Sequence, residues 1–134
     1  MNEAETRQLA AMTIKGTESG AFYTMAWGGS VPPGGYRKLP IAVRSSPLRI
    51  FPYPTEVPAC TSRFFSWRDW QHRSKETHPL ILACHMTAYF VHIHPFPDGN
   101  GRVSRMIMHD YCTWYARATC QLSCKTWTAR TISE

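Results

Sequence analysis

The pattern of apolar and polar positions is strongest in the second half of the chain. After Pro58, which suits the first turn of a helix, one face recurs at intervals of three and four residues, at Cys60, Phe64, Trp67 and Gln71. Arginines fall between these positions. The spacing predicts an amphipathic helix with one face turned to a core.

A second helix is predicted from Pro79 to about residue 92. Its apolar side chains are distributed almost completely around the helix axis: Leu80, Ile81, Ala83, Cys84, Ala88, Phe90 and Val91. Such a distribution is typical of a helix that is buried on all sides. We therefore expect this helix to form the centre of the core.

A third helix is predicted from about Arg102 to Ala116, after a stretch rich in proline, glycine and asparagine. Its inward positions are predicted to be Val103, Met106, Ile107 and Tyr111 or Cys112. Residues 117–134 show weak periodicity and many threonine, serine and cysteine residues, so no helix is predicted there.

The first half of the chain carries weaker signals. Residues 3–15 are rich in helix formers, and Gly16 would end a helix there. Residues 28–35, rich in glycine and proline, indicate a loop. Two short β-prone runs between residues 41 and 51 flank a turn signal. The predicted fold class is therefore mainly α, a helical core with one β-hairpin.

Length and composition narrow the class of protein. The chain has 134 residues, 43% of them apolar, so we expect residues 1–134 to form a single domain with a core. The longest apolar stretch, residues 80–93, is too short and too polar for a membrane span. The N-terminus carries acidic residues where a signal peptide would carry basic ones, and the five cysteines include no C-x-x-C pair. We expect an intracellular protein with free thiols, cytoplasmic or nuclear, neither secreted nor membrane-bound. The net charge of +6 favours anionic partners.

Candidate chemistry is concentrated in the segment HPFPDGNGRVSR, which runs from His94 to Arg105. Glycines in a loop that leads into a helix let the backbone approach closely, and the N–H groups of a helix N-terminus bind phosphate. Arg102 and Arg105 lie one turn apart near the helix start, where the helix dipole prefers acids, so an anionic ligand explains them better than local stability does. Asp98 is a natural Mg²⁺ ligand, and His94 can act as a general base. For the glycines alone, a plain turn is the alternative, and Phe96 is most simply a structural anchor in the core.

This segment resembles the signature of the Fic (Fido) family, H-x-F-x-[D/E]-G-N-G-R-x-x-R, and matches it at every specified position. The order of the flanking elements is similar too: Gly35-Tyr36-Arg37, the hairpin, Val57-Pro58 before a helix and His78-Pro79-Leu80 before the buried helix. The resemblance covers about residues 33–114. Residues 1–32 would be a helical and irregular lead-in, and residues 117–134 an atypical tail.

The resemblance implies an adenylyltransferase that moves AMP from ATP to a serine, threonine or tyrosine hydroxyl of a target protein. His94 would be the catalytic base, and Asp98 would hold Mg²⁺ against the phosphates. The phosphate-binding residues would be Gly99, Asn100 with its side chain, Gly101, Arg102 and Arg105. Glycine at position 101 favours AMP transfer, because relatives with lysine there resemble the Doc kinases.

The resemblance also implies a protein substrate that is bound by the hairpin, which would be the family's flap and would add the target as a strand. Its docking residues would be Ile41, Ala42, Val43, Leu48, Arg49 and Ile50. Many relatives carry an inhibitory motif [S/T]-x-x-x-E-[G/N], which this sequence lacks. We therefore expect either an unrestrained enzyme or control by a separate regulatory protein.

Alternative functions remain open from the sequence. The atypical tail favours one alternative, a catalytically impaired remnant that binds ATP or a protein. Another alternative is an enzyme that transfers UMP, phosphocholine or phosphate instead of AMP. A zinc site is not expected, because His92 and His94 lack further ligands at a recognisable spacing. Nucleic acid is not an expected partner, since the aromatic residues of segment 63–70 have the helical spacing of core side chains.

Overall fold

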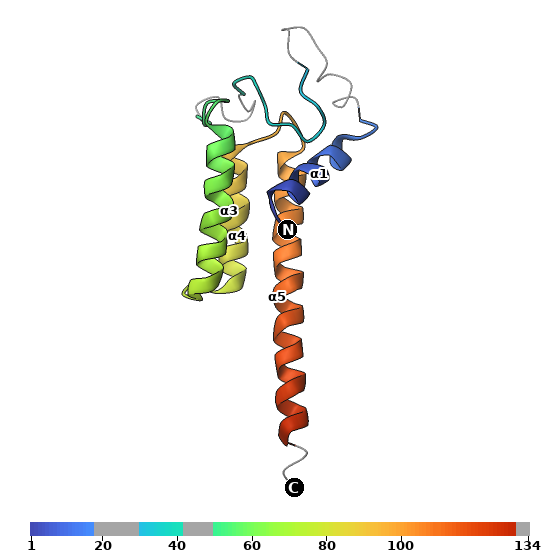
Figure 1. Cartoon of the computed structure of the whole chain (residues 1–134), viewed down its shortest axis with the longest axis vertical. Helices are drawn as coiled ribbons and strands as arrows, with labels where there is room; N and C mark the ends of the chain where they lie inside the picture. The colour runs from blue at the N-terminus through green and yellow to red at the C-terminus, as the bar shows by residue number, and fades with distance from the viewer. Residues whose placement is uncertain (18–29, 42–49, 131–134) are drawn as a thin grey trace.

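A computed structural model describes the backbone of residues 1–17, 30–41 and 50–130, and the side chains of these segments as far as residue 117. The helices of these segments are α1 (Glu3–Ile14), α3 (Val57–Ser74), α4 (Pro79–Ile93) and α5 (Asn100–Arg130) (Figure 1). The described residues contain no strand. The predicted hairpin lies outside them apart from its ends, and the mainly helical class is confirmed.

The helices pack around α4 and the first half of α5. Helices α3 and α4 run side by side in opposite directions, and α4 also packs against α5 (Figure 1). Helix α1 lies obliquely against the N-terminal part of α5 (Figure 1). The C-terminal part of α5 extends well beyond the rest of the bundle (Figure 1). The loop between α4 and α5, which contains the signature, therefore lies at the same end of the bundle as α1.

Aromatic side chains from α3 and α4 fill the centre of the core. Phe64 is completely buried, and its ring meets those of Tyr89 and Phe90 edge to face, with ring centroids 5.4 and 5.6 Å apart. Each such pair contributes roughly 0.5–1.5 kcal/mol beyond the burial of its area. Around them lie other side chains that are at most 2% exposed: Val57, Leu82, Met86, Ile93, Val103 and Ile107.

Helix α1 confirms the weak prediction for residues 3–15. A capping box begins it: Asn2 accepts a hydrogen bond from the backbone N–H of Glu5, and the Glu5 carboxylate accepts one from that of Asn2. Just beyond its end, Gly16 has a φ of +77°, a conformation that glycine adopts without strain. Local signals alone are enough to place this helix.

The prediction that the second helix is buried on all sides is wrong. Leu80 and Ile81 are 62% and 52% exposed, and Cys84 and Ala88 are exposed as well. The reason is that α3 and α5 cover only part of the circumference of α4. The distribution of apolar residues around a helix indicates which side chains can be buried. The number of neighbouring helices decides which of these side chains are buried in the folded protein.

The prediction for the third helix is partly wrong. Val103, Ile107 and Tyr111 point inward, as expected, but Met106 is 44% exposed. The helix also runs through residues 117–130, for which no helix was predicted. Since no glycine or proline follows Gly101, and threonine, serine and cysteine oppose a helix only weakly, an established helix propagates through this segment.

Among the described residues, no helix combines the length and hydrophobicity that a bilayer crossing requires.

Candidate active site

His94 ends α4 in a left-handed conformation, with φ 50° and ψ 59°. Its backbone N–H donates to the carbonyl of Phe90 at 3.0 Å, and its side-chain Nδ1 lies 3.2 Å from the carbonyl oxygen of Val91. A carbonyl oxygen only accepts hydrogen bonds, so this contact assigns the proton to Nδ1. In the neutral imidazole, Nε2 is then the nitrogen with the lone pair, which is the one a general base uses.

Phe51 lies against the imidazole of His94, with ring centroids 4.9 Å apart and ring planes inclined by 57°. Sequence reasoning treated Phe51 only as the end of a predicted strand. An aromatic residue at the junction of a flap and the core is a weak signal, and nothing in the sequence placed it beside His94.

Asn100 closes the loop that follows His94. Its Oδ1 accepts from the backbone N–H of Phe96 at 2.9 Å, and its Nδ2 donates to the carbonyl of Phe96 at 2.7 Å. Both residues are buried, and the Phe96 ring stacks on that of Tyr36 at 5.9 Å. These bonds use Oδ1 and one of the two N–H donors of the Asn100 amide, so phosphate binding by Asn100, with its side chain, stays a prediction.

The start of α5 has the features of an anion site. The N–H groups of Asn100, Gly101 and Arg102 have no acceptor one turn earlier in the helix, and the positive end of the helix dipole lies there. Gly99 precedes them with a φ of +80°, and its carbonyl accepts from the N–H of Val103 at 2.9 Å. The backbone is thus arranged to present N–H groups to a negatively charged ligand.

The two glycines of the loop have different requirements. A Cβ on Gly99 would lie 3.1 Å from Oγ1 of Thr13 and would also force a side chain into a left-handed conformation. A Cβ on Gly101 would meet only Nη1 of Arg105, at an ordinary distance of 3.6 Å. Gly99 is therefore required by conformation and space, whereas nothing around Gly101 excludes a small side chain.

Asp98 is the carboxylate nearest to this anion site along the chain. Its Oδ1 accepts from the N–H of Gly99 at 2.6 Å, and its Oδ2 lies 3.3 Å from Nη2 of Arg102. Its side chain is 41% exposed, so solvent and ligands can reach it. The described residues contain no group of three or more histidine, cysteine or acidic side chains that could hold a metal by themselves. One carboxylate beside a phosphate site does fit Mg²⁺, which completes its shell with phosphate oxygens and water.

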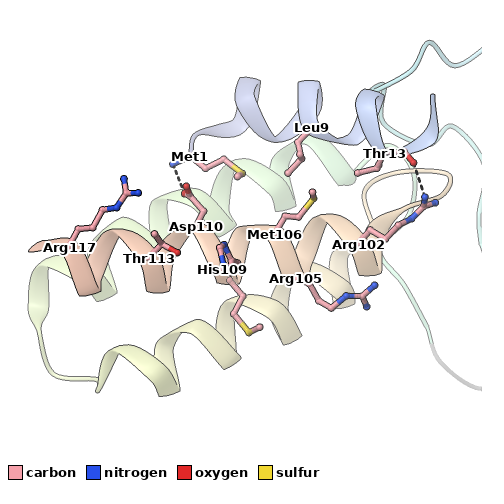
Figure 2. A pocket seen from close by; sticks show the side chains of 11 residues that line it. Met1, Leu9, Thr13, Arg102, Arg105, Met106, His109, Asp110, Thr113 and Arg117 are labelled. Atoms are coloured by element: carbon pink, nitrogen blue, oxygen red, sulfur yellow. Dashed lines mark hydrogen bonds and ion pairs between the residues drawn. The ribbon is translucent and has the colours of Figure 1, made fainter. Parts of the chain in front are cut away.

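The two signature arginines line one groove of about 900 Å³ between α1 and α5. Arg102 donates through Nη1 to the carbonyl of Thr13, at the end of α1, at 2.7 Å. Figure 2 shows Arg102 reaching toward α1, while the side chain of Arg105 leaves α5 in another direction. His109 and Arg117 continue the basic lining of the groove further along α5. Arg102 and Arg105 are thus the cations of this groove near the anion site, whereas Asp110 also lines it further along α5.

Most of the residues expected to dock a target protein are outside the described segments, namely Ala42, Val43, Leu48 and Arg49. Ile41 is partly buried, and Ile50 is 85% exposed. Target docking by these residues stays a prediction.

Comparisons with known proteins agree with the signature. The family model described as Fic/DOC family matches residues 1–112. Proteins named protein adenylyltransferase Fic from Drosophila persimilis and Drosophila melanogaster are 41% identical over 58 residues, which make up 43% of this chain. The match covers 11% and 12% of their lengths, respectively, so the chain corresponds to only a small part of these relatives. A solved Fic-domain-containing signaling protein from Bacteroides thetaiotaomicron has the same fold, with a TM-score of 0.63 and 22% identity over 81% of this chain and 37% of that one.

Proposed function

Because the chain belongs to the Fic/DOC family, we propose that it transfers AMP from ATP to a serine, threonine or tyrosine hydroxyl of a target protein. The orientation of His94 carries this proposal: Nδ1 faces the carbonyl of Val91, which leaves Nε2 as the basic nitrogen. The relatives named protein adenylyltransferase support the same reaction class.

His94 would act as the general base. Nε2 takes the proton from the target hydroxyl while that oxygen forms a bond to the α-phosphorus of ATP. The bond between the α-phosphorus and the oxygen that bridges to the β-phosphate breaks, and pyrophosphate leaves. Such proton transfer contributes typically about 10²–10⁴-fold to the rate.

The start of α5 would bind the phosphates. The backbone N–H groups of Asn100, Gly101 and Arg102 would donate to phosphate oxygens, in front of the positive end of the helix. The guanidinium groups of Arg102 and Arg105 would neutralise charge that develops on the leaving pyrophosphate. Arg102 can do so while it binds Thr13 and Asp98, because a guanidinium has more N–H donors than these two contacts use.

Asp98 would hold Mg²⁺ through its exposed carboxylate. When bound, the ion would supply positive charge that offsets the phosphate charge and would help to fix the orientation of ATP. Removal of Mg²⁺ with EDTA is therefore expected to abolish transfer, and added Mg²⁺ to restore it. Transfer that persists in EDTA would contradict this role of Asp98.

The decisive experiment compares ATP labelled at the α-phosphate with ATP labelled at the γ-phosphate, each incubated with the protein and Mg²⁺ in a cell lysate. The variants are His94→Ala and the matched control His92→Ala, whose side chain is exposed one residue beyond Val91 on the same helix. AMP transfer predicts protein labelling from α-labelled ATP alone, lost in His94→Ala and kept in His92→Ala. Labelling from γ-labelled ATP alone would indicate kinase chemistry, and ATP binding without either label would indicate a non-catalytic module.

A further inference from the structure

Arg37 is a buried cation that contacts the backbone on either side of His94. It is 3% exposed, and among the described residues no carboxylate pairs with it. Burial lowers the pKa of its guanidinium from the ordinary value. An unpaired charge in such a place is costly unless hydrogen bonds satisfy it. The hydrogen-bond acceptors of the Arg37 guanidinium are all backbone carbonyl oxygens, and they lie in two parts of the chain.

One set of acceptors lies at the end of α4. The Nε of Arg37 donates to the carbonyl of His94 at 2.8 Å, and its Nη2 lies 3.5 Å from that of Ile93. The backbone N–H of Arg37 donates to the carbonyl of Pro95 at 2.9 Å. A single residue therefore holds three consecutive carbonyls centred on His94. These are groups that a helix end leaves without partners, and a cation there also suits the helix dipole.

A second set of acceptors flanks the segment predicted to be the flap. Nη1 of Arg37 donates to the carbonyl of Leu39 at 3.2 Å, and Nη2 to that of Pro52 at 2.5 Å. Next to Pro52 lies Phe51, whose ring contacts the imidazole of His94. The planar fork of the guanidinium thus connects the backbone on both sides of residues 42–49 with the end of α4.

The conformation of His94 depends on such support. A non-glycine residue in the left-handed region costs roughly 1–2 kcal/mol and persists where the surroundings determine it. That backbone conformation brings Nδ1 to the carbonyl of Val91 and so selects the tautomer with a basic Nε2. We propose that Arg37 is a positioning residue for transfer: by holding the carbonyl of His94, it orients the base and joins it to the flanks of the flap. Only the expected effect of Arg37 on the rate of AMP transfer rests on the proposed function.

The variant Arg37→Lys tests the proposal, because lysine keeps the charge but cannot reach carbonyls on both sides with one ammonium group. We expect kcat to fall on the order of 10²-fold, the effect of a small misplacement of a catalytic group. The KM for ATP should change by no more than about threefold, since the Asn100–Phe96 bonds hold the phosphate loop independently.

Arg7→Lys is the matched control. Arg7 donates to the carbonyl of Gly34 at 3.0 Å and lies 5.1 Å over the Tyr36 ring, so it supports the same segment without contacting His94. Its kcat should remain within about twofold of the wild-type value. Equal losses of kcat in the two variants would mean that Arg37 supports only the fold, and would overturn the proposal.

A second readout requires no transfer activity. In the nucleotide-free protein, ¹⁵N NMR of the His94 side chain should show the Nδ1-protonated tautomer, and Arg37→Lys should shift it toward a mixture. If the wild-type protein transfers no AMP, the proposed function fails while this measurement still decides the role of Arg37. An unchanged ¹⁵N signature in a folded Arg37→Lys protein would overturn the proposal.

If Arg37→Lys does not fold, the wild-type protein supplies the test. The Nε–H resonance of Arg37 should be protected from solvent exchange and show a coupling across the hydrogen bond to the carbonyl of His94. Rapid exchange of that proton, or the absence of the coupling, would refute the proposed contact.

Discussion

Helices α3 and α4 end in the same unusual way. Lys75 follows α3 with φ 56° and ψ 16°, and His94 follows α4 with φ 50° and ψ 59°. Within the described segments, these are the two residues other than glycine that have a positive φ. Each carries a local cost of roughly 1–2 kcal/mol compared with a relaxed backbone.

The surroundings of the two residues differ. Lys75 is exposed, and the side-chain hydrogen bonds described beside it are local ones, from Ser74 to the carbonyl of Gln71 and from Thr77 to Oε1 of Gln71. His94 is held by Arg37, which is 57 residues away in the sequence, and contacts Phe51. At α3 the strained helix end only turns the chain, whereas at α4 tertiary contacts hold the strained residue in one orientation.

Replacing His94 with glycine should have the largest effect. Glycine adopts the left-handed conformation without strain, so we expect folding stability to be retained, while transfer falls by about 10²–10⁴-fold with the loss of the base. Thermal unfolding and transfer of α-labelled phosphate are measured on the same preparation. Retained transfer would show that His94 serves only as a helix end, as Lys75 does.

Removal of the Asn100 side chain tests whether the loop after His94 is held by its own bonds. Asn100→Ala leaves the buried N–H and carbonyl of Phe96 without partners, and we expect the free energy of unfolding to fall by about 2–3 kcal/mol. Urea unfolding at 25 °C measures it. The control Asn2→Ala removes an exposed helix cap and should cost about 1 kcal/mol. Equal losses in the two variants would argue against a loop closed by Asn100.

Substitution of Gly99 should have a smaller effect on folding stability, and the same substitution at Gly101 is its control. Gly99→Ala should lower the free energy of unfolding by about 1–2 kcal/mol, because alanine at a φ of +80° is strained and its Cβ crowds Thr13. Gly101→Ala should be neutral or stabilising by up to about 1 kcal/mol, because the position is helical and has space. Chemical denaturation measures the free energy of unfolding of both variants. A larger loss for Gly101→Ala than for Gly99→Ala would contradict the described loop.

Lys75→Gly should produce the smallest change. Relief of the left-handed strain, less the added freedom of glycine in the unfolded chain, should raise the free energy of unfolding by about 0.5–1 kcal/mol. Transfer activity should not change, since Lys75 follows α3, and α3 ends at the end of the bundle opposite the loop between α4 and α5 (Figure 1). A change in kcat would mean that the two helix ends are coupled, and the contrast between them would no longer hold.

Much of the fold could be predicted because its signals are local. Helix α1 follows from the helix formers of residues 3–15 and from Gly16 after them, and the starts of α3 and α4 follow from prolines at positions that suit a first helical turn. Helix α5 is longer than predicted because weak periodicity does not end a helix by itself, and the segment after residue 116 contains no glycine or proline. The exposed side of α4 could not be predicted, because the sequence of a helix does not show how many other helices will pack against it.

The sequence by itself determined the signature and its candidate site residues, because the spacing of the histidine, aspartate, glycines and arginines within one loop and helix start is a local property. Only the tertiary structure decided how they are held. It assigned the Asn100 side chain to Phe96, brought Arg102 to a carbonyl 89 residues away, and placed Arg37 on the backbone of His94. Such contacts depend on how separate helices pack, and a guanidinium or an amide has no preference for one carbonyl over another until packing places it there.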